Sequence, residues 1–144
     1  HPRALSGDPY YAKVIAHMNS RFEQRGYKLE ELTFSAPPPE LQQRALIVRP
    51  AKGTTGGPLW LVFGGNAMLS ADWLEFCERL VAADDSRESP TFLLFDYPGY
   101  GENNGKPSPD STLRTSRAVL ADVLRRHSGT KELNLLGHSL GAAA

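Results

Sequence analysis

The chain of 144 residues is long enough for one domain with a hydrophobic core but too short for two. Its 16 basic and 16 acidic residues cancel, so no strong field would attract nucleic acid or an anionic membrane surface. A single cysteine, Cys77, excludes an internal disulfide, and no Cys and His cluster suggests a metal site. No apolar stretch reaches membrane-spanning length, and no signal-peptide pattern opens the chain.

The first part of the chain predicts one helix and two strands. Apolar residues at helical spacing follow Pro9, and Gly26 is expected to end that helix. Tyr27 to Ser35 shows imperfect alternation of apolar and polar residues, and Leu41 to Arg49 is largely apolar. The proline-rich segment 36–40 between them cannot continue a strand, so we expect a hairpin.

Three strands are expected in the second part. Leu59 to Phe63 and Thr91 to Phe95 are continuous apolar runs, typical of strands buried on both faces, and Leu133 to Leu136 forms a third, shorter run. Helical patterns separate the runs. This alternation predicts right-handed β-α-β crossovers and a mostly parallel sheet with helices on both faces.

The two intervening helices carry apolar stripes. We expect Ser70 to cap the first of them, whose stripe consists of Trp73, Phe76, Cys77, Leu80 and Val81. Cys77 is therefore expected in the core rather than as a nucleophile. The second helix is capped by Ser108 or Asp110, and its apolar residues are Leu113, Val119, Leu120, Val123 and Leu124.

Residues 137–141, Gly-His-Ser-Leu-Gly, form a Gly-x-Ser-x-Gly motif between an apolar run and three alanines. This is the layout of a nucleophile elbow, in which a strand turns sharply into a helix and presents a serine. Gly137 and Gly141 lack Cβ atoms and so permit strained angles and close approach. We predict Ser139 as a nucleophile; the alternative is a tight turn with an inert serine.

Ligands of parallel sheets bind at the carboxyl ends of the strands. Three loops are expected to meet there: residues 64–70, residues 96–109 and the elbow at Ser139.

The motifs in these loops resemble the α/β-hydrolase superfamily of serine hydrolases. Residues 64–67 read Gly-Gly-Asn-Ala, and residues 96–101 read Asp-Tyr-Pro-Gly-Tyr-Gly. Together with the elbow they are most similar to the branch with a His-Gly-Asn-Ala oxyanion loop. The resemblance covers residues 27–144 and implies the N-terminal portion of an α/β-hydrolase domain, preceded by a helical extension at residues 1–26.

The resemblance also implies roles for individual residues. Ser139 would be the nucleophile, and the backbone N–H groups of Asn66 and Leu140 would hold the oxyanion. No cofactor or metal is implied. The chain departs from the branch at three positions, with Gly64 in place of His, Pro98 in place of Arg and Asn103 in place of Ser.

A serine nucleophile needs a histidine base and a carboxylate, which follow the serine in this fold. Only five residues follow Ser139, and its neighbour His138 is expected to point away from it. We therefore expect the N-terminal part of a longer hydrolase of esters, thioesters or amides with a small-molecule acyl substrate. The chain alone would be nearly inactive and would expose the elbow strand as an apolar edge. Both ends look cut, so localisation stays open.

Two other functions fit the same residues. A hydrolase-like binding protein would keep the serine but lose the downstream acid or histidine. The replacement of the family's His by Gly64 is the feature of the chain that favours this alternative. An acyltransferase on the same scaffold would share every residue named above. A Rossmann-type nucleotide binder is disfavoured, because no Gly-x-Gly-x-x-Gly follows a strand.

Overall fold

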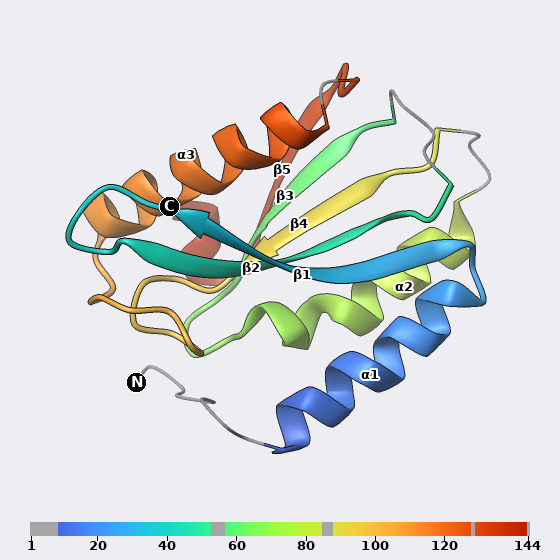
Figure 1. Ribbon diagram of the computed structural model, residues 1–144, viewed down its shortest axis with the longest axis horizontal. Helices are drawn as coiled ribbons and strands as arrows, with labels where there is room; N and C mark the ends of the chain where they lie inside the picture. Colours follow the sequence, from blue (N-terminus) through green and yellow to red (C-terminus); the bar gives the residue numbers. More distant parts are fainter. Residues whose placement is uncertain (1–8, 53–56, 85–87, 128, 144) are drawn as a thin grey trace.

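The computed structural model describes residues 9–52, 57–84, 88–127 and 129–143 (Figure 1). In chain order the elements are α1 (Pro9–Glu23), β1 (Tyr27–Ser35), β2 (Gln42–Pro50), β3 (Leu59–Phe63), a 3-10 turn (Ser70–Trp73), α2 (Leu74–Ala83), β4 (Thr91–Phe95), α3 (Pro109–Arg126), β5 (Leu133–Gly137) and a second 3-10 turn (Ser139–Ala143).

The five strands form one sheet in the order β1-β2-β4-β3-β5. Both β1 and β4 pair antiparallel with β2, whereas β3 pairs parallel with β4 and β5. Among the described strands only β2 therefore runs against the others, and the sheet is mostly parallel. The predicted hairpin and the predicted β-α-β crossovers are confirmed.

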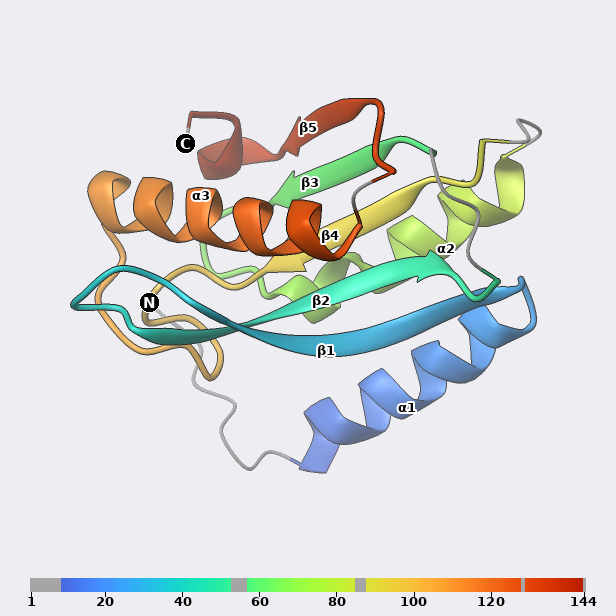
Figure 2. The same cartoon turned by 45° about the horizontal axis from the view of Figure 1, so that its top comes forward.

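Helices cover both faces of the sheet, with α1 and α2 on one side and α3 on the other (Figures 1 and 2). Successive residues of β2 point to opposite faces of the sheet. Leu46 and Val48 belong to the same hydrophobic core as Phe22 of α1, and Ile47 belongs to the other core, with Val119 of α3. This alternation is the period-two pattern of a strand buried on both faces.

The hairpin departs slightly from the expected bounds. β2 begins at Gln42 rather than Leu41 and continues to Pro50. Leu41 has a φ of +54° and is 57% exposed. A left-handed residue cannot continue an extended strand, so Leu41 belongs to the turn.

The prediction that Ser70 caps the first crossover helix is wrong. Ser70 lies buried in a 3-10 turn whose N-cap is Leu69, and α2 begins only at Leu74, with Trp73 as its N-cap. The backbone N–H of Ser70 donates to the Asp96 carboxylate at 2.6 Å. This tertiary bond, which no local pattern reveals, ties the Ser70 backbone to the end of β4 while Ser70 lies inside the 3-10 turn.

Both predicted stripes are partly wrong. On α2, Phe76 is 41% and Leu80 is 39% exposed, whereas Leu74 and Glu78 are buried. Glu78 faces α1 because it receives hydrogen bonds from Arg21 and Arg25 at 2.8 and 3.1 Å. The prediction of Cys77 as a core residue is confirmed by its complete burial.

On α3, Leu113 is 47% and Leu124 is 37% exposed. Val119 and Val123 are fully buried, and hydroxyl side chains supply the other buried positions, namely Ser111, Thr112, Thr115 and Ser116. Ser108, one of the two predicted caps, accepts the N–H of Ser111 at 3.1 Å.

At the ends of the described fold, α1 buries Met18 and Phe22 against the sheet, and β5 forms an edge. Leu133 and Leu135 of β5 are 43% and 65% exposed.

The division of the chain at residue 26 stays a prediction. None of the helices described combines the length and apolarity needed to cross a bilayer.

Candidate active site

Ser139 lies two residues after the end of the strand β5, at a φ of +54°. The flanking glycines have no room for a side chain. A Cβ on Gly137 would lie 2.6 Å from the carbonyl oxygen of Gly141. A Cβ on Gly141 would lie 2.7 Å from the Gly64 carbonyl oxygen and would also clash with the Phe63 carbonyl oxygen. The turn at Ser139 is thus sharp, and the chain on both sides of it is tightly packed.

The oxyanion loop, which we define as residues 64–70, contacts this turn. A Cβ on Gly65 would lie 3.0 Å from the His138 ring, and the backbone N–H of His138 donates to the Phe63 carbonyl at 3.1 Å. Of the three loops predicted to meet at the carboxyl end of the sheet, this loop and the elbow are therefore in direct contact.

The two predicted oxyanion donors lie at the surface, where Asn66 is exposed and the Leu140 side chain is 52% exposed. The local backbone bonds run from Met68 N–H to the Gly65 carbonyl at 3.2 Å and from Gly141 N–H to the His138 carbonyl at 2.9 Å. Among the bonds between backbone groups outside the helices and strands of the described residues, none is donated by the N–H of Asn66 or Leu140.

The segment after β4 is the third loop, and it is bonded to the oxyanion loop. The Tyr97 hydroxyl donates to the Gly64 carbonyl at 2.6 Å, and the Tyr100 hydroxyl donates to the Asn66 side-chain oxygen at 3.0 Å. Sequence reasoning assigned neither tyrosine a role. The signal was present in the Asp-Tyr-Pro-Gly-Tyr-Gly motif, but the motif does not tell which atoms the hydroxyls reach.

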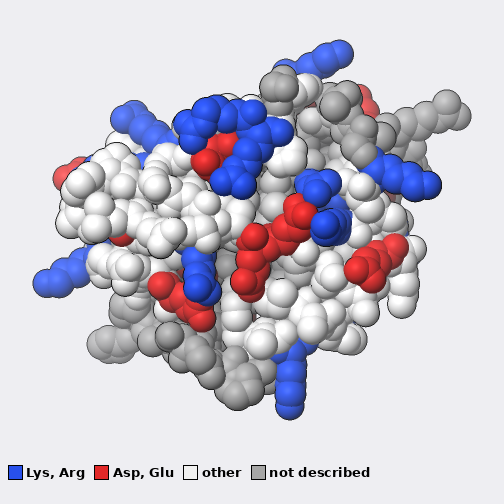
Figure 3. Space-filling view, in the orientation of Figure 1, with Lys and Arg blue, Asp and Glu red and all other residues white. Residues whose placement is uncertain are grey.

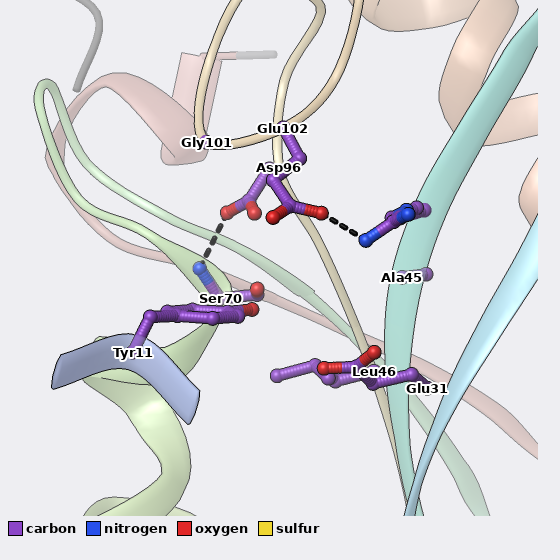
Figure 4. Close-up of a pocket in the computed structure, with 9 residues that line it drawn as sticks. Tyr11, Glu31, Ala45, Leu46, Ser70, Asp96, Gly101 and Glu102 are labelled. Carbon is purple, nitrogen blue, oxygen red and sulfur yellow. Dashed lines mark hydrogen bonds and ion pairs between the residues drawn. The ribbon is translucent and has the colours of Figure 1, made fainter. Parts of the chain in front are cut away.

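Asp96 begins this segment and is 9% exposed. Burial raises the pKa of its carboxyl, and the hydrogen bond from Ser70 N–H opposes the rise. Figure 4 shows this bond, with Tyr11 of α1 and Gly101 on either side of a small pocket. Ser139 does not line that pocket, so the pocket is separate from the predicted nucleophile.

Ion pairs engage arginines at both ends of β2. Glu102, which follows Gly101, forms an ion pair with Arg44 of β2. At the opposite end of β2, away from the site, Arg49 binds Glu30 of β1 at 2.8 Å. On the face drawn in Figure 3, basic and acidic side chains are interspersed rather than segregated.

The described histidines lie in three different places. The His138 ring packs against the edge of Trp73, with ring centroids 5.7 Å apart. His17 is exposed on α1. His127 caps the end of α3, at the end of β5 remote from Ser139, and burial there lowers its pKa. His1 lies outside the described residues.

Residues 58–143 match the family whose description is "alpha/beta hydrolase fold". Among solved structures, the chain is similar to the esterase Pf2001 of Pyrococcus furiosus, at 15% identity and a TM-score of 0.62. It is also similar to the esterase Est22 with p-nitrophenol, at 14% identity and a TM-score of 0.66. A bacterial heroin esterase aligns at 15% identity with a TM-score of 0.62.

These alignments cover 83%, 94% and 92% of this chain but only 46%, 42% and 41% of the respective structures. The chain thus spans less than half the length of the proteins it is similar to. A search of curated protein sequences finds no match. At these identities the structural likeness establishes the fold, and it agrees with the family match.

Proposed function

The chain belongs to the α/β-hydrolase fold family, and from this membership we propose that it supplies the nucleophile and oxyanion hole of a serine hydrolase. The substrate is a small ester, thioester or amide. The observation that carries the proposal is the position of Ser139, at a left-handed turn after β5 between two glycines whose Cβ atoms would clash. The contact between this turn and the oxyanion loop supports it.

In the proposed reaction, Ser139 Oγ attacks the carbonyl carbon of the substrate. Its proton passes to a histidine that a segment beyond this chain supplies, and that histidine then protonates the leaving group. The N–H groups of Asn66 and Leu140 hold the oxyanion, and each such donor stabilises the transition state by about 3 kcal/mol. Water then releases the acid from the acyl-enzyme by the same route.

Ester hydrolysis by the full-length protein tests the proposal. With p-nitrophenyl butyrate, Ser139→Ala is expected to lower kcat by at least about 10³-fold, because loss of a triad nucleophile leaves only binding and oxyanion stabilisation. Ser20→Ala removes an exposed hydroxyl from α1 and serves as the matched control. Activity of Ser139→Ala equal to that of the wild type would refute the proposed nucleophile.

The same assay separates the alternatives. An added acceptor alcohol that captures the acyl group in preference to water would identify an acyltransferase on this scaffold. A folded full-length protein without turnover or acylation would favour a binding protein that has lost its downstream acid or base. Either result replaces the hydrolase proposal.

A further inference from the structure

The oxyanion loop is held at three points by one neighbouring segment, residues 96–100. At the first residue of the loop, the Gly64 carbonyl accepts the Tyr97 hydroxyl at 2.6 Å. At the last, the Ser70 N–H donates to Asp96 at 2.6 Å. Between these ends, the Asn66 side-chain oxygen accepts the Tyr100 hydroxyl at 3.0 Å.

The donors of this segment are themselves rigidly packed. Tyr97 and Tyr100 meet edge to face with ring centroids 5.6 Å apart, and Tyr97 meets Phe95 of β4 at 5.8 Å. Both tyrosines are at most 5% exposed. Gly101 leaves room for the Asp96 carboxylate, because a Cβ there would lie 2.6 Å from Asp96 Oδ2. The three contacts therefore start from atoms with little freedom to move.

The middle contact differs from the two at the ends. Asn66 is exposed, and its side chain reaches back to a buried hydroxyl. The next residue, Ala67, has a φ of +59°, so the chain turns sharply just after Asn66. A side-chain bond at that place restricts rotation of the Asn66 residue, and with it the direction of the Asn66 N–H.

On the premise of the proposed function, we propose that Tyr100 is a positioning residue for the oxyanion hole, acting through the Asn66 side chain. Asp96 and Tyr97 hold the two ends of the oxyanion loop, and Tyr100 sets the orientation of the residue whose N–H stabilises the oxyanion. Preorganised donors of this kind act in the transition state rather than on the bound substrate.

Kinetics of the full-length protein with p-nitrophenyl butyrate test this inference. Tyr100→Phe removes only the hydroxyl and is expected to lower kcat about tenfold with KM nearly unchanged, a smaller loss than the ~10²–10³-fold for a missing donor. Inhibition by an alkyl trifluoromethyl ketone, whose adduct carries the oxyanion, should weaken by the same factor. Asn66→Ala should reproduce both losses, and the double variant should be no worse than either single variant.

Tyr27→Phe is the matched control, since it removes the hydroxyl of another buried tyrosine, on β1. It should leave kcat unchanged. Wild-type kcat in Tyr100→Phe, or losses that multiply in the double variant, would overturn the positioning role. If Tyr100→Phe fails to fold, Asn66→Ala decides alone, with unchanged kcat as the refuting result. Activity that survives Ser139→Ala would instead refute the proposed function, so the two failures are distinguishable.

Discussion

Ser139, together with the glycines two residues before and after it, shows how a few residues can determine a turn. The serine adopts a φ of +54°, a region that side-chain-bearing residues enter at a cost, and the glycines allow strand and turn to approach closely. The Gly-x-Ser-x-Gly motif itself shows that the two positions flanking this turn carry no side chain. The sequence therefore predicted the elbow more reliably than the surrounding helices.

Gly141→Ala should destabilise the protein by about 3 kcal/mol, at the upper end of the usual cost of overpacking. The added Cβ would meet two backbone carbonyl oxygens, of Phe63 and Gly64, which cannot rotate away. Equilibrium urea unfolding measures the loss. Gly26→Ala is the control, since Gly26 has a φ of +73° but nothing within 4 Å of an added Cβ. A smaller loss for Gly141→Ala than for Gly26→Ala would contradict the close packing.

Residue-level errors of the sequence analysis have a shared cause. Ser70 has a good capping side chain, and Phe76 and Leu80 fit an amphipathic stripe. In the structure, the backbone N–H of Ser70 donates to Asp96, and Glu78 is the α2 residue that is buried and bonded to Arg21 of α1. Both outcomes depend on partners more than 25 residues away or in another helix, which local patterns do not reveal.

At the scale of elements, one ion pair joins the β1–β2 turn to α3. Arg114 binds Glu40 through two hydrogen bonds, of 2.8 and 3.2 Å, and the Glu40 side chain is only 2% exposed. The hydrogen bonds from Arg114 hold the pKa of the Glu40 carboxyl below its ordinary value of 4.5. Removal of the arginine would leave a buried carboxylate without its cation.

Arg114→Ala should lower the urea midpoint at pH 7, whereas Arg117→Ala, at an exposed position of the same helix, should not. Because the pKa of Glu40 is lower in the folded than in the unfolded state, the pair stabilises fully above pH 4.5 and loses its effect as the pH falls through the folded value. The difference in midpoint between wild type and Arg114→Ala should therefore shrink below pH 4.5. A constant difference down to pH 2.5 would contradict the assignment.

For the molecule as a whole, the sequence predicted the fold class and the order of strands and helices, and the family match at residues 58–143 confirms both the resemblance and the fold. Apolar runs and glycine motifs are local features, so the sequence alone is enough to predict the elements that they form. The three bonds between residues 96–100 and the oxyanion loop cannot be predicted in this way, because they depend on how neighbouring strands of the sheet place their loops. The roles of Ser139, Asn66 and Leu140 remain predictions.

Covalent trapping in the full-length protein identifies which residue carries the acyl group. The protein is mixed with excess p-nitrophenyl butyrate, quenched in acid within the first turnover, digested and examined by peptide mass spectrometry. We expect a butyryl group on the peptide that contains Ser139, and none on that peptide in Ser139→Ala. A p-nitrophenol burst with the acyl group on another residue would contradict it.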